Sequence, residues 1–140
     1  MFMLPKPAGF KIAIPRVDID GAPMHGDKPI AMHVIFSVAY VANRYITNCT
    51  IIFSNCHGNS ACIVGYAVCH PNDEVDVVTG RRVALRDSFS YFLPEFYAHQ
   101  GEVSGKQIRK YWHEIRCICR QAGAFQSEEY KRFAPPPLAA

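Results

Sequence analysis

Two apolar runs joined by a short polar turn constrain the fold of this chain more than any other feature. Residues 50–56 and 61–69 are both rich in β-branched and aromatic side chains, which favour strands. The four residues between them, His-Gly-Asn-Ser, form a connection of a length common in β-hairpins. The second run is apolar on both alternating faces, which predicts a central strand covered on both sides. Gly65 within it indicates a bulge or the close approach of another backbone.

The strongest helical pattern lies later in the chain, at residues 104–122. Ser104 is suited to cap this helix and Gly123 to end it, and Arg116 and Arg120 suit its C-terminal end. Large apolar residues form one stripe along it: Ile108, Tyr111, Trp112, Ile115, Ile118, Cys119 and Ala122. The stripe is wide for a small sheet. Core packing is the more common explanation, and an oligomer contact is the alternative.

Residues 30–46 fit two patterns. Apolar residues recur there at helical spacing, and Asp27 and Pro29 suit the start of a helix. The same segment also alternates in polarity and is dense in β-branched and aromatic residues. We expect a helix, with a strand as the alternative. Residues 10–19 alternate as a strand does, and Pro15 favours an edge position for it.

Together these patterns predict an α+β fold, with a small, mainly antiparallel sheet and two to three packed helices. We expect one domain over residues 1–133 and a disordered, Pro-rich tail over residues 134–140. The net charge of +3 permits an anionic ligand but is too weak to indicate a duplex-DNA-binding protein. No apolar run suits a signal peptide or a membrane span, so we expect a cytoplasmic protein that does not bind a membrane.

The sequence offers little for catalysis or metal binding. None of the six cysteines has the spacing of a zinc site, and most lie in apolar runs, so we expect buried free thiols and no metal or other cofactor. Motifs for a nucleophilic serine, a phosphate-binding loop or a metalloprotease are absent. Cys69 and His70 are neighbours at the end of a predicted strand, where adjacent side chains point to opposite faces and cannot readily form a nucleophile–base pair.

A cluster of arginines follows the predicted hairpin. Thr79 is a candidate N-cap for a helix that we expect to continue until Pro94, which places Arg81 and Arg82 in its first turn. Cations there are unfavourable unless an anion lies nearby, because a helix N-terminus already carries partial positive charge. Either the carboxylates of the preceding loop or a bound phosphate could supply this anion, and spacing alone does not decide between them. The candidate ligand-binding residues are Asn72, Asp73, Gly80, Arg81, Arg82 and Arg86.

Residues 69–75 (Cys-His-Pro-Asn-Asp-Glu-Val) and 80–85 (Gly-Arg-Arg-Val-Ala-Leu) resemble a motif of small bacteriophage proteins, the Thoeris anti-defence 1 family. In that motif a Cys-containing strand leads to Asp-x-Phe and, after four residues, to Gly-Arg-x-x-Ala-x-x-Arg. Here Val75 stands in place of the Phe, and Asp87 in place of the last Arg, with Arg86 next to it.

The resemblance implies a homo-oligomeric, non-enzymatic protein of the host cytoplasm. Such a protein would bind a cyclic nucleotide immune signal of the cyclic ADP-ribose type and sequester it uncleaved, which blocks host antiviral signalling. Capture would be tight where the ligand is buried between subunits, because phosphate–arginine bonds then face less competition from water. Two alternatives are a phage protein that binds a host protein through the Trp112 helix, and a small nucleotide-cleaving enzyme.

Overall fold

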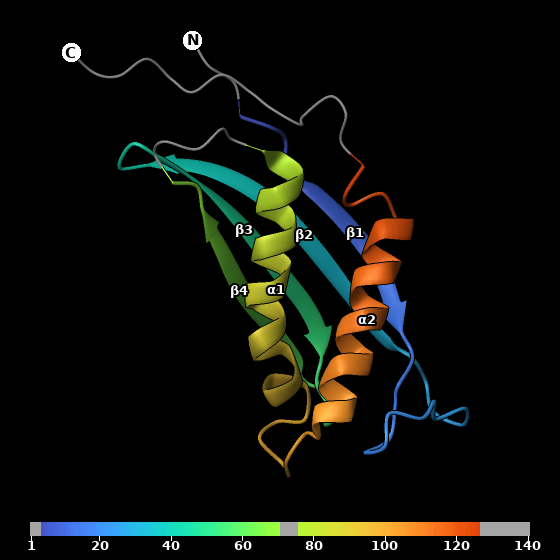
Figure 1. The fold of residues 1–140 in the computed structure, drawn as a ribbon. Helices are drawn as coiled ribbons and strands as arrows, with labels where there is room; N and C mark the ends of the chain where they lie inside the picture. The colour runs from blue at the N-terminus through green and yellow to red at the C-terminus, as the bar shows by residue number, and fades with distance from the viewer. Residues whose placement is uncertain (1–3, 71–75, 127–140) are drawn as a thin grey trace, which may run out of the picture.

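The computed structural model describes residues 4–70 and 76–126 and consists of one antiparallel sheet with two helices on one face (Figure 1). The strands pair in chain order, as β1 (Ala8–Ile14), β2 (Ile30–Val41), β3 (Arg44–Ser54) and β4 (Ser60–Val68). The helices are α1 (Val77–Phe96) and α2 (Gly105–Gln121). The predicted α+β class is confirmed. The expected tail at 134–140 lies outside the described residues.

The expectation of a helix at residues 30–46 is wrong. This segment forms β2 and the start of β3, joined by a tight turn in which Ala42 and Asn43 have φ angles of 52° and 64°. Two-residue hairpin turns need such positive φ values. β2 is the second strand of the sheet and pairs with both β1 and β3, so hydrogen bonds to two neighbouring strands override a helical pattern that is equally present in the sequence.

The two outer strands differ in how well the sequence predicts them. β1 lies at an edge, as predicted, and ends directly before Pro15. The hairpin of β3 and β4 is confirmed. β4 is nevertheless the other edge strand and is buried on one face only, so the expectation of a central strand covered on both sides is wrong. Its outward side chains, such as Val64 and Tyr66, are apolar but exposed.

Helix α1 lies unusually close to β4 at Gly65. A Cβ atom on Gly65 would overlap the backbone nitrogen of Ser88 and lie 2.7 Å from the carbonyl oxygen of Ala84. The predicted close approach of another backbone is thus confirmed. Next to this contact, the Asp87 carboxylate accepts a hydrogen bond of 2.8 Å from the backbone N–H of Tyr66, which satisfies a donor of the edge strand.

The core lies between the sheet and the two helices, with α1 over β3 and β4 and α2 beside β1. Helix α2 begins as predicted, because Ser104 forms a capping box with Gln107. Pro94 does not end α1, which continues to Phe96. The helices bury mainly aromatic and aliphatic residues: Ala84, Leu85, Phe89, Phe92, Leu93 and Phe96 from α1, and Tyr111, Ile115 and Cys119 from α2.

The Gly65 contact leads to a stability prediction. Gly65→Ala should lower the free energy of unfolding by about 2 kcal/mol or more, because the new methyl group must push α1 away from the sheet. Gly26→Ala is the matched control, since nothing lies within 4 Å of the added Cβ, and its effect should stay within about 0.5 kcal/mol. Urea unfolding measures both. Equal effects at the two positions would contradict the close approach.

Candidate functional site

The N-terminus of α1 lies earlier than the sequence suggests. Asp76, and not Thr79, caps the helix, and its carboxylate accepts hydrogen bonds from the backbone nitrogens of Val78 (3.0 Å) and Thr79 (3.2 Å). Arg81 and Arg82 therefore lie in the second turn, beyond the unpaired N–H groups of the first. Two other candidates, Asn72 and Asp73, lie outside the described residues.

Gly80 and Arg81 both face the protein interior. A Cβ on Gly80 would overlap the side chain of Thr47 on β3. Arg81 is only 6% exposed; its Nη1 donates a hydrogen bond of 3.0 Å to the carbonyl oxygen of Ala124, and its guanidinium lies 5.5 Å from the ring centroid of Phe36. Burial lowers the pKa of this guanidinium. The carbonyl lies just after α2, where partial negative charge and the aromatic face stabilise a cation.

Arg82 and Arg86 lie on a different side of α1 and face α2. Together with Arg116, Arg120 and Trp112 of α2 they line a cavity of about 310 Å³, whose wall also includes Val83, Leu85 and Phe125. The Arg82 guanidinium lies 5.5 Å from the ring centroid of Phe125. Four arginines from two helices that are separated in the sequence thus line one cavity.

A second, larger cavity of about 760 Å³ continues along the helices and shares Arg86, Trp112 and Arg116 with the first. Its wall is mainly apolar and includes Phe89, Leu93, Pro94, Tyr97, Val103 and Ile108. Arg109 and His99 also line it. We call the two cavities together the interhelical groove. It combines a cationic part with an apolar part, and Trp112 belongs to both.

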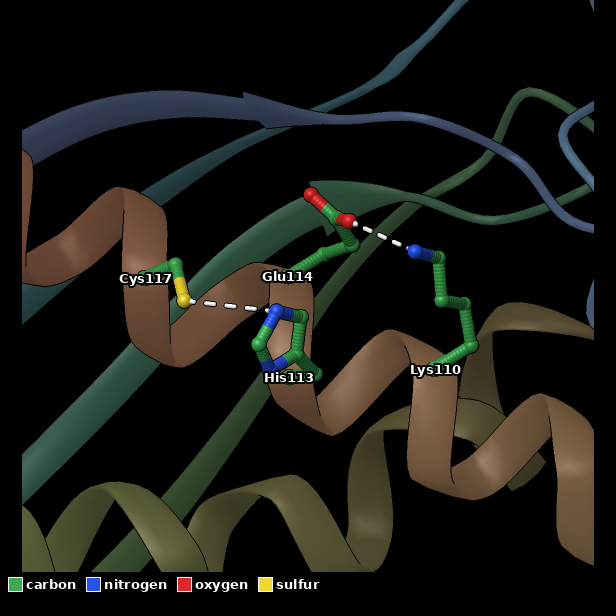
Figure 2. Close-up of polar contacts among 4 residues, drawn as sticks. All are labelled: Lys110, His113, Glu114 and Cys117. Atoms are coloured by element: carbon green, nitrogen blue, oxygen red, sulfur yellow. Dashed lines mark hydrogen bonds and ion pairs between the residues drawn. The ribbon is translucent and has the colours of Figure 1, made fainter.

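The charge of the groove arginines is not balanced by carboxylates of the described residues. No described carboxylate lies within 4.0 Å of the nitrogens of Arg82, Arg86, Arg109, Arg116 or Arg120. The one acidic side chain of α2 pairs with a lysine of the same helix. Glu114 pairs with Lys110 at 3.2 Å, and His113 contacts Cys117 at 3.7 Å on another flank of α2 (Figure 2). Such unpaired guanidinium forks suit phosphate or carboxylate ligands.

Trp112, the only tryptophan of the chain, supplies an aromatic surface in the groove. Its ring packs against Phe89 with centroids 5.2 Å apart, and the Arg116 guanidinium lies 5.7 Å from its centroid. An aromatic ring held in this way can stack on a planar ligand group.

The sequence alone locates only the side of this groove that α1 forms. Arg82 and Arg86 are candidates from the sequence, whereas Arg109, Arg116 and Arg120 are not, and Trp112 is assigned there to a core or oligomer stripe. A signal exists, because residues 109, 112, 116 and 120 are spaced by three or four positions and share one side of a helix. What the spacing cannot reveal is that this side faces the arginines of α1.

The thiols show no sign of a shared site. All six cysteines are free, but only Cys49 and Cys119 are buried, and burial raises the pKa of each to about 12. Cys56 and Cys62 are exposed, so the expectation of buried thiols holds only in part. Within residues 4–70 and 76–126, no three His, Cys, Asp or Glu side chains are placed to share a metal ion.

Comparison of the chain with protein-family models, curated proteins and solved structures found no significant match. The resemblance to the Thoeris anti-defence 1 family therefore stays a prediction. In the part of the chain that the structure describes, neither helix has the length and apolar character needed to cross a membrane.

The two neighbouring arginines of α1 should behave differently. Arg81→Ala should lower the free energy of unfolding by about 2 kcal/mol, because it leaves a cavity and removes the donor to Ala124. Arg82→Ala removes an exposed side chain and should change the free energy of unfolding by less than about 0.5 kcal/mol. Chemical denaturation measures both. An unchanged stability of Arg81→Ala together with lost ligand binding would instead support the site expected from the sequence.

Proposed function

We propose that this protein binds a small phosphate-bearing nucleotide in the interhelical groove and sequesters it without cleaving it. The observation that carries the proposal is that Arg82, Arg86, Arg116 and Arg120 line one cavity together with Trp112, with no described carboxylate paired to them. Guanidinium forks bind phosphate oxygens in pairs, and an indole ring stacks on a base. A nucleotide offers both chemical groups within one small molecule.

The shape of the groove supports the same ligand class. The cationic cavity of about 310 Å³ has room for phosphate groups, and the adjoining cavity of about 760 Å³ offers apolar walls for a base and sugar. Each hydrogen bond between a guanidinium and a phosphate contributes about 1.5–3 kcal/mol. Several such bonds, with stacking on Trp112, favour tight retention.

Sequestration fits the groove better than cleavage does. Arginine only donates hydrogen bonds and keeps its proton, so the four arginines can hold a phosphate group but cannot act as a general base. An imidazole could act as a general base, and among the described residues of the groove His99 carries the one imidazole. It lines only the larger cavity and lies 3.5 Å from a carboxylate oxygen of Glu95. The chemistry around the proposed phosphate position is therefore that of a binding site.

The biological role that we propose rests on ligand capture. A protein that holds a cyclic nucleotide immune signal lowers its free concentration and keeps the host's antiviral effector inactive. The resemblance at residues 69–87 to Thoeris anti-defence 1 proteins supports a cyclic ADP-ribose isomer as the first ligand to test, and a phage protein acting in the host cytoplasm as its source.

The single tryptophan permits a direct test. Addition of cyclic ADP-ribose isomers or cyclic dinucleotides should change the fluorescence of Trp112, and heat denaturation should release the ligand intact for chromatography. Arg86→Gln and Arg116→Gln should each weaken binding about tenfold or more, because each removes charged hydrogen bonds. Arg44→Gln, at the exposed turn between β2 and β3, is the control and should bind as the wild type does.

The other outcomes separate the alternatives. A ligand recovered in altered form would make the protein a nucleotide-cleaving enzyme and refute sequestration. No response to any nucleotide would refute the proposed function, and affinity capture of a host protein that depends on α2 would then support the protein-binding alternative.

A further inference from the structure

The sheet has a second face, which no described element covers. The helices pack on one face (Figure 1). Burial alternates along the strands, so every second residue lies on the face away from the helices. Strand register arranges the outward residues in rows across the sheet, such as His33–Ile52–Cys62 and Ile35–Thr50–Val64. We call this surface the outer sheet face.

The outer sheet face is more apolar than a solvated sheet surface needs to be. Ile52 (39% exposed), Val64 (36%), Tyr66 (55%) and Val68 (54%) adjoin one another on β3 and β4. A sheet that is open to water usually alternates apolar and polar residues, with the polar ones outside. Contiguous apolar surface of this kind marks an interaction site.

The outer sheet face has few charged side chains, and those it has lie at its margin. Strands β1 to β4 contain no Asp or Glu. Lys11 lies on edge strand β1 and Arg44 at the turn that begins β3, so both cationic side chains are at the margin. Near the middle, the Oδ1 atom of Asn48 is buried and accepts no hydrogen bond within the described structure. An apolar centre with a polar rim is the pattern of protein interfaces.

We propose that the outer sheet face binds a second copy of this chain, so that two sheets pack face to face in a dimer. With strands of 7 to 12 residues, a spacing of about 4.8 Å and a rise of about 3.3 Å per residue, this face measures roughly 600 Å². Two copies would bury roughly 1,200 Å², which is the lower end of stable protein interfaces.

A second copy fits this surface for two reasons. A sheet packs on another sheet at about 10 Å with their strands nearly aligned, and a two-fold axis presents the same apolar rows to each other. Strands β1 to β4 contain no carboxylates, so the surface offers nothing that would select a basic partner. Lys11 and Arg44 lie at the rim, where both cations stay in contact with water.

Sedimentation of the purified protein tests the proposal. Wild type should be a dimer at about 100 µM and dissociate on dilution, and Ile52→Asp and Val64→Asp should be monomeric at all concentrations because a carboxylate would be buried in the interface. Ile19→Asp is the control: Ile19 is 62% exposed but lies in the loop after β1, and this variant should remain dimeric. Circular dichroism establishes that each variant is folded.

Thiol labelling of the wild type gives an independent readout that needs no variant. Cys62 lies beside Ile52 on the outer sheet face, whereas Cys56 lies in the turn between β3 and β4, and both are exposed in one copy. Labelling of Cys62 should slow as protein concentration rises, while that of Cys56 should not. A monomeric wild type, a dimer that survives Ile52→Asp and Val64→Asp, or labelling of Cys62 that does not depend on concentration would each overturn the proposal.

Discussion

The contact between α1 and the sheet determines how the helix layer is arranged and which side chains reach the groove. It is close at two glycines, Gly65 on β4 and Gly80 on α1, and at each a methyl group would overlap atoms of the facing element. These contacts fix the rotation of α1 about its axis. Because successive residues of a helix are separated by about 100°, this rotation turns Arg81 into the core and leaves Arg82 on the side of α2.

The rest of the fold shows where local sequence is sufficient. The hairpin and α2 can be predicted because their signals, a short polar turn and a capped amphipathic stripe, are local. Residues 30–46 carry helical and strand periodicity together, and the choice depends on pairing with other strands, among them β1, which the loop of residues 15–29 separates from this segment. The burial of β4 on one face only is also a non-local property, since it depends on which strands lie beside it.

The candidate site illustrates the same limit more sharply. Sequence places a cluster of arginines on α1, but it cannot separate Arg81 from Arg82, which differ only in the direction of their side chains. It also misses Arg116 and Arg120, because a helix pattern gives the faces of α2 without the rotation that sets one of them against α1. Asp87 stands where the resembled motif has its last Arg, and the structure gives this departure a role, because its carboxylate accepts a hydrogen bond from the backbone N–H of Tyr66 at the sheet edge.

The two proposed surfaces lie on opposite sides of one sheet, and this arrangement has a consequence for ligand capture. The interhelical groove belongs to the helix layer, whereas the outer sheet face is on the far side of the strands. A dimer formed through its sheets would therefore carry two complete grooves that face away from each other. Each copy would bind its own ligand, and burial of that ligand would depend on α1 and α2 of one chain. Retention must then come from the guanidinium contacts and Trp112, and a ligand shared between subunits would require a different interface.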